Sequence, residues 1–97
     1  MIINLNLEGK KIIVVGGGNE AEKRIKPILN EKCEIIVISD SINIQISKLV
    51  KTKQVKFKKQ KIENVKFILE LKPDLIITTT NDKKINQKIR FIIIQYN

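Results

Sequence analysis

A run of three glycines, Gly16-Gly17-Gly18, followed by Ala21 three positions later, contains the residues best suited to chemistry. Where a strand enters a helix, the pattern Gly-x-Gly-x-x-Ala is typical of dinucleotide binding. The first glycine permits a tight turn, the last lets a pyrophosphate approach the backbone, and Ala21 allows the helix to pack closely on the strand. The N–H groups of the first helical turn, at Asn19 and Glu20, would face the phosphates together with the positive end of the helix dipole.

A second candidate group follows the next apolar run, where Ser39 and Asp40 stand at the expected strand tip. In dinucleotide-binding proteins an acid about twenty residues past the glycines binds the adenine ribose hydroxyls. An acid there favours NAD over NADP, because it would repel the additional phosphate. The alternative is that Asp40 only caps a helix that begins at Ser41.

A third group follows another apolar run, at Thr79, Thr80 and Asn81, while Asp82 could equally cap a final helix. Ligands of open α/β sheets bind outside the carboxyl ends of the strands, so these residues would lie on the same side as the glycine turn. The residues expected to bind the cofactor are therefore Gly16, Gly17, Gly18, Asn19, Glu20, Ala21, Ser39, Asp40, Thr79, Thr80 and Asn81.

Other kinds of site have little support. The chain has no histidine, which removes the commonest general base and metal ligand, and its scattered acids show no metal-ligand spacing. We therefore expect no metal site. The single cysteine, Cys33, has apolar neighbours and is expected to be packed rather than reactive.

The elements that position these groups follow from the apolar spacing. Continuous apolar runs predict strands buried on both faces, and a kink is expected at Pro27, whose missing N–H removes a helical hydrogen bond. We expect strands at 11–15, 34–39 and 75–79, a short edge strand around Val55 and Phe57, and helices at 19–31, 41–50, 64–71 and 82–96. The order predicts one α/β domain over residues 1–97, a Rossmann-like, doubly wound, mostly parallel sheet in three αβα layers.

The composition is basic, with 19 Lys and Arg against 10 Asp and Glu and a net charge of +9. Six lysines lie between Lys51 and Lys61 with one aromatic, Phe57, whereas a nucleic-acid surface more often interleaves several rings, so nucleic acid is not the expected partner. A solvated edge is one interpretation, and attraction of a polycarboxylate by Lys56, Lys58, Lys59 and Lys61 is the other. No apolar run is long enough for a bilayer and no signal peptide is evident, so we expect a cytoplasmic protein without membrane contact.

Several of these stretches together resemble a known family, the precorrin-2 dehydrogenases, which also form the N-terminal domain of siroheme synthases. The resemblance rests on Leu7-Glu8-Gly9-Lys10, on the glycine run with its preceding strand, on Ala21-Glu22-Lys23-Arg24, and on Thr80-Asn81-Asp82 followed by Asn86. It implies NAD-dependent oxidation of precorrin-2, a tetrapyrrole, to sirohydrochlorin in siroheme synthesis. It also implies a homodimer and, in several members, a ferrochelatase activity of the full-length protein.

The resemblance covers only the front part of the family's proteins. Their catalytic aspartate lies at the end of the next strand, beyond Asn97, so the catalytic residues are unknown here. We accordingly expect the domain to be incomplete at its C-terminal end and the isolated chain to be inactive. Lys23-Arg24 stands where the family usually has Arg-Lys, a swap that keeps the charge but changes the bidentate geometry at each position. The alternative function is a regulatory Rossmann module that senses a nucleotide without catalysis.

Overall fold

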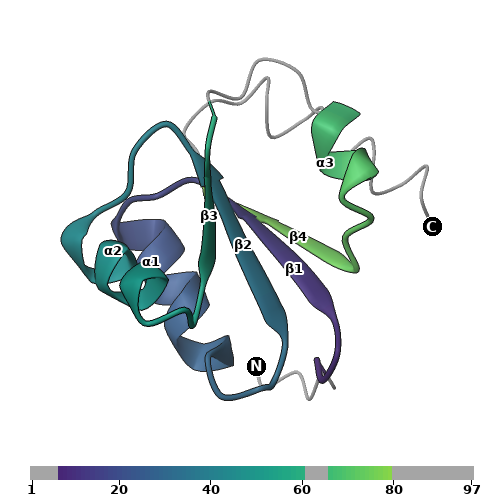
Figure 1. The fold of residues 1–97 in the computed structure, drawn as a ribbon, viewed down its shortest axis with the longest axis horizontal. Coiled ribbons are helices and arrows are strands. Elements are labelled where there is room, and N and C mark those ends of the chain that lie inside the picture. The colour runs from purple at the N-terminus through teal and green to yellow at the C-terminus, as the bar shows by residue number, and fades with distance from the viewer. Residues whose placement is uncertain (1–6, 61–65, 80–97) are drawn as a thin grey trace.

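The computed structural model describes residues 7–60 and 66–79 of the chain (Figure 1). Strands and helices alternate along it, as the apolar spacing predicts. The elements are β1 (Lys11–Val15), α1 (Asn19–Ile25), a 3₁₀ helix (Lys26–Ile28), β2 (Glu34–Ser39), α2 (Ile44–Lys51), β3 (Lys56–Lys59), α3 (Lys66–Glu70) and β4 (Leu75–Thr78).

The described strands form one parallel sheet in the order β3-β2-β1-β4. Within it, Val15 of β1 pairs with Ile38 of β2 and with Thr78 of β4, so these three strands end at the same level. Parallel strands need crossover connections, which the intervening helices supply. The predicted Rossmann-like α/β fold is therefore confirmed.

Both faces of the sheet are covered by helices, which makes three layers. Ile12 and Val14 point into a core with α1 and α2, whereas Ile13 and Val15 pack with Ile68 of α3 on the other face. Figure 1 shows α1 and α2 on one side of the strands and α3 on the other. These four β1 side chains are fully buried, which explains why β1 reads as a continuous apolar run rather than an alternating one.

The helix boundaries differ from those expected. Helix α1 ends at Ile25 rather than continuing to position 31, and the 3₁₀ turn that follows contains Pro27, which has no N–H to donate to Lys23. Helix α2 begins at Ile44, and the side chain of Asn43 accepts a hydrogen bond from the Ile46 amide at 2.9 Å. The alternative that Asp40 caps a helix beginning at Ser41 is therefore wrong.

Strand β3 lies at one edge of the sheet, as its alternating pattern predicts. Val55 and Phe57 face the core beneath α1 and α2, and the intervening lysines are exposed. Exposed lysines on an edge strand oppose pairing with another chain. The expected helix over 82–96 lies outside the described residues. Within the described part of the chain, no helix has the length and apolar character needed to cross a membrane.

Candidate functional site

The glycine turn lies at the carboxyl ends of three neighbouring strands. The Gly16 amide donates a hydrogen bond to the Ile38 carbonyl of β2 at 3.0 Å, and the Thr79 amide donates to the Val15 carbonyl of β1 at 2.9 Å. The end of β2 and the residue after β4 therefore flank the turn. As far as the described residues reach, the three groups of site residues predicted from the sequence therefore lie together at the carboxyl end of the sheet.

Gly16 begins the turn in a conformation that only glycine adopts readily, with φ of +122°. A Cβ atom built on it would also overlap the hydroxyl of Thr79. That hydroxyl donates a hydrogen bond to the Val15 carbonyl at 2.9 Å, which joins the residue after β4 to the end of β1. The strand ends consequently approach so closely that a side chain at position 16 has no room.

Gly17 packs against the segment that follows β2. A Cβ on Gly17 would overlap the Ser41 carbonyl oxygen and come within 2.9 Å of Ile42 Cγ2. The Gly17 carbonyl accepts a hydrogen bond from the Asn43 amide at 2.8 Å. The turn and the approach to α2 are thus held against each other.

Gly18 differs from both, because it is exposed and a Cβ on it would meet nothing within 4 Å. It is the N-cap of α1 in an extended conformation and contributes no side-chain cap to the first turn. The first amides of a helix have no partner within the helix. An exposed, uncapped turn of this kind has the donors and the open approach that a pyrophosphate requires, so the residues present fit a dinucleotide.

The first residues of α1 contribute in different ways. The Asn19 and Glu20 side chains are exposed, and the Glu20 carboxylate lies 3.9 Å from the Lys23 ammonium. The backbone amides of Asn19 and Glu20 are suited to an anionic ligand, whereas the Glu20 carboxylate would repel one. Ala21 is fully buried in the core between α1 and the sheet, so its part is the close helix–strand packing predicted for it.

Ser39 and Asp40 lie at the tip of β2. Ser39 is half-buried and follows Ile38, whose carbonyl accepts the hydrogen bond from the Gly16 amide. The Ser39 hydroxyl accepts a hydrogen bond from the Ser41 amide at 3.4 Å. Asp40 is exposed at the following position. Both residues are therefore next to the turn, and the Asp40 carboxylate is open to solvent. Thr80 and Asn81, the remaining candidates, lie outside the described residues.

Asn43 is a polar residue at this edge that sequence reasoning missed. Its side-chain amide donates to the Glu22 carboxylate at 2.9 Å and to the Asn19 side chain at 3.3 Å. The Lys26 ammonium, 2.9 Å from Glu22, lowers the pKa of that carboxyl, and Asn43 adds to this effect while partial burial opposes it. The available signal was the cap position: an asparagine three residues before the apolar series Ile46, Leu49 and Val50.

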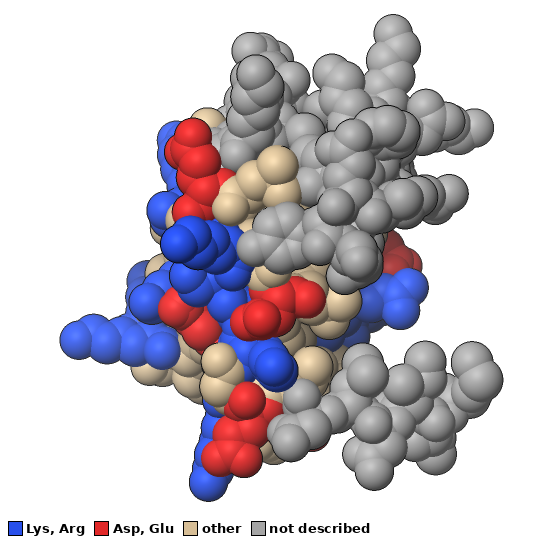
Figure 2. All heavy atoms as spheres, turned by 90° about the vertical axis from the view of Figure 1, so that its right-hand side faces the viewer, with Lys and Arg blue, Asp and Glu red and all other residues tan. Residues whose placement is uncertain are grey.

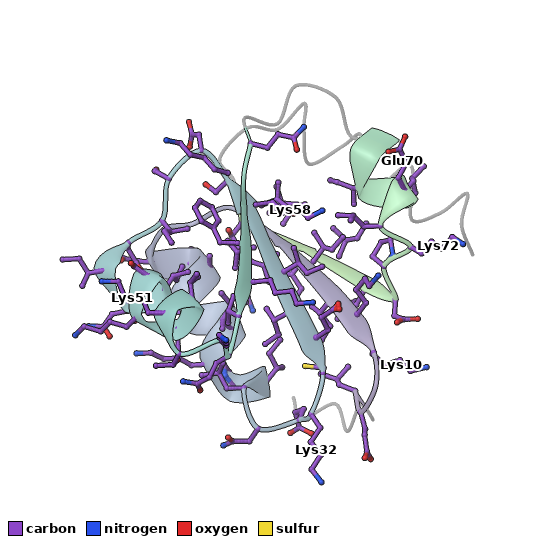
Figure 3. The ribbon with its side chains drawn as sticks, in the orientation of Figure 1. Lys10, Lys32, Lys51, Lys58, Glu70 and Lys72 are labelled. Carbon is purple, nitrogen blue, oxygen red and sulfur yellow. The ribbon has the colours of Figure 1, made fainter. Side chains whose placement is uncertain are left out.

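The lysine-rich segment is not one cluster. The Lys56 ammonium lies 3.5 Å from the carboxylate of Glu34, which is near the amino end of β2. In the register of the sheet, Lys58 lies opposite Ile38, which is near the carboxyl end of β2. Lys59 alternates to the opposite face of β3. Figure 3 shows the labelled Lys10, Lys32, Lys51, Lys58 and Lys72 spread around the molecule. On the face shown in Figure 2, described basic and acidic side chains are interspersed.

Cys33 is packed, as expected. It contacts the core beneath α1 and α2, and its thiol lies 3.6 Å from the Ile28 carbonyl. Burial raises the pKa of the thiol, so the nucleophilic thiolate is disfavoured. Among residues 7–60 and 66–79, the acids and this cysteine form no group of three that could hold a metal ion.

Comparisons with known proteins agree with this geometry. A family described as "Putative NAD(P)-binding" matches residues 3–93. A precorrin-2 dehydrogenase of Bacillus subtilis (strain 168) is 28% identical over 87 residues, which cover 90% of this chain and 52% of that protein. A precorrin-2 dehydrogenase of Priestia megaterium is 30% identical over 88 residues, which cover 91% of this chain and 42% of that protein. The family resemblance found in the sequence is therefore confirmed.

A solved structure, "SirC, precorrin-2 dehydrogenase", superposes with a TM-score of 0.80 and 31% sequence identity. The match covers 90% of this chain and 42% of that structure. This chain thus spans about half the length, or less, of the relatives it matches. The matched part is the one that contains the glycine turn.

Proposed function

This chain belongs to the family of NAD(P)-binding domains that form the front part of precorrin-2 dehydrogenases and siroheme synthases, and we propose that it binds NAD for the oxidation of precorrin-2 to sirohydrochlorin. When bound, the nicotinamide accepts the hydride. The proposed roles of the chain's residues are to hold the pyrophosphate at the glycine turn and the adenine ribose at the tip of β2. The observation that carries the proposal is the exposed, uncapped Gly18 at the start of α1, together with the exposed Asp40 at the tip of the neighbouring strand β2.

The relatives favour this reaction over nucleotide sensing without catalysis, since the Bacillus subtilis and Priestia megaterium proteins are both named precorrin-2 dehydrogenases. We propose that the whole protein acts as a homodimer on a tetrapyrrole. A spectrophotometric assay of sirohydrochlorin formation from precorrin-2 and NAD tests the reaction. Turnover by residues 1–97 alone would place the catalytic group within this chain, with Asp82, outside the described residues, as the first candidate.

NAD(H) is expected to bind more tightly than NADP(H), by about tenfold or more. Asp40 is exposed at the tip of β2, where its carboxylate would accept from the ribose hydroxyls and repel a 2′-phosphate. Calorimetric titration with both cofactors measures the difference. In Asp40→Ser the preference should narrow, since the repelling charge is removed.

The matched control is Glu31→Gln, which removes an exposed carboxylate from the turn before β2, at the opposite end of the sheet. That variant should retain the preference of the unmodified chain. Equal or tighter binding of NADP(H) by the unmodified chain would contradict the assignment of Asp40 to the ribose.

The tetrapyrrole substrate carries carboxylates, and we propose that Lys58 helps to attract them. It is exposed near the carboxyl end of the sheet, while the neighbouring Lys56 has Glu34 as a partner. Sirohydrochlorin should bind with marked salt dependence, because exposed charges are screened over roughly 8 Å at physiological ionic strength. Lys58→Gln should reduce that dependence more than Lys56→Gln when binding is followed by absorbance at several salt concentrations.

Duplex DNA provides the comparison for this prediction. It should bind weakly and without sequence preference, because phosphate contacts alone carry no sequence information. Tight binding to one nucleic-acid sequence would instead make the lysines part of a nucleic-acid surface.

A further inference from the structure

Asn43 connects the two segments that the proposed function assigns to the cofactor. Its backbone amide donates to the Gly17 carbonyl in the glycine turn at 2.8 Å, and its side-chain amide reaches Glu22 and Asn19 in α1. Its side-chain oxygen accepts from the Ile46 amide at the start of α2. One residue therefore contacts the turn, the helix after the turn and the helix after β2.

These contacts depend on different parts of the residue. Any amino acid other than proline would keep the backbone hydrogen bond to Gly17, and Ser or Asp would keep the cap of α2. Only the side-chain N–H₂ group distinguishes asparagine here, because it is the donor to Glu22 and Asn19. The ionised Glu22 carboxylate accepts without donating, and its second oxygen is held by Lys26. The amide group therefore completes a link between the first turn of α1 and the entry to α2.

We propose that Asn43 is a positioning residue for the dinucleotide: through Glu22 and Asn19 it holds the start of α1, and with it Gly18, at a fixed place relative to Asp40. This role rests on the proposed function, because it assumes that pyrophosphate and ribose bind at those two places. Pyrophosphate and ribose are covalently joined, so a change in the spacing of their sites weakens both contacts at once. The Asn43 side chain itself touches no part of the ligand in this proposal.

A helix cap alone would have a different signature, and three variants separate the two roles. Asn43→Ser and Asn43→Asp both retain a good cap for α2 but lose the donor to Glu22. Asn43→Asp also places a carboxylate opposite the Glu22 carboxylate. In Glu22→Gln combined with Asn43→Asp, the new amide donates to the new carboxylate, which restores the link with donor and acceptor exchanged.

Calorimetric titration with NADH should show affinity weakened about tenfold in Asn43→Ser and more in Asn43→Asp. The melting temperature of Asn43→Ser should fall only slightly, because the cap of α2 remains, and that of Asn43→Asp should fall further, because its carboxylate faces the Glu22 carboxylate. The double variant should bind about fivefold more tightly than Asn43→Asp alone, an exchange effect that a cap cannot produce. Asn30→Asp, which makes the same chemical change at an exposed turn before β2, is the matched control and should bind normally.

The outcomes distinguish the two levels of proposal. Failure of the unmodified chain to bind NADH would overturn the proposed function. Normal binding by the unmodified chain together with normal binding by Asn43→Asp would overturn the positioning role and leave the proposed function standing. Weak binding by Asn43→Asp that the Glu22→Gln exchange does not improve would also overturn it, because the link to Glu22 would then not be the cause.

Discussion

Replacement of Gly18 by leucine is expected to weaken dinucleotide binding by about a hundredfold or more while the chain stays folded. The backbone at Gly18 is extended and a Cβ there meets nothing within 4 Å, so the fold accommodates the side chain. The leucine would instead occupy the space in front of the first turn of α1, where the pyrophosphate would bind. The hydrogen bonds from the backbone amides of this turn to the charged phosphates would then all be lost, because the pyrophosphate could no longer approach them.

Calorimetry with NADH measures the loss, and circular dichroism with a thermal melt checks the fold. Asn30→Leu is the matched control, since it also adds an exposed leucine but lies in the turn before β2. It should bind as the unmodified chain does. Undiminished affinity in Gly18→Leu would place the pyrophosphate away from the glycine turn.

Much of the fold could be predicted from the sequence because the central strands are buried on both faces. A strand with this burial must be apolar throughout, and the runs 12–15 and 35–38 contain only Ile and Val. Their bounds in β1 and β2 match the expectation. The edge position of β3 was predictable for the opposite reason, since one of its faces is wet and its residues alternate.

Helix ends were less predictable, because they depend on which polar side chain satisfies the first amides. Asp40, Ser41 and Asn43 are all acceptable caps by residue type, and the choice falls on Asn43. Its selection follows from contacts with Gly17 and Glu22, more than twenty residues earlier in the chain. A local pattern carries no information about such contacts.

The same limit applies to the glycines of the candidate site. The sequence pattern predicts a role for Gly16 in the turn and for Gly18 in the approach of a ligand, and the structure has open space at Gly18. The sequence pattern could not indicate that Gly17 faces the Ser41 carbonyl or that Gly16 faces the Thr79 hydroxyl. Both neighbours come from other strand ends, so their closeness depends on the register of the sheet.

Gly16→Ala is expected to lower the free energy of unfolding by about 3 kcal/mol, from backbone strain and overpacking together. The strain arises because φ is +122°, and the overpacking arises because the new methyl group meets the Thr79 hydroxyl. Domains of this kind are stable by roughly 5–15 kcal/mol, so such a loss is a large fraction of the total stability. Urea denaturation followed by circular dichroism gives the value.

Thr79→Ala separates the two causes. Alone it removes the hydroxyl donor to the Val15 carbonyl, which still accepts from the Thr79 backbone amide, and should cost about 1 kcal/mol. Combined with Gly16→Ala it removes the steric conflict, so the double variant should be less destabilised than the sum of the single changes, while the backbone strain persists. Strict additivity would mean that the Thr79 hydroxyl does not limit position 16. The requirement for glycine would then come from φ alone, and the strand ends would be held less tightly than their hydrogen bonds indicate.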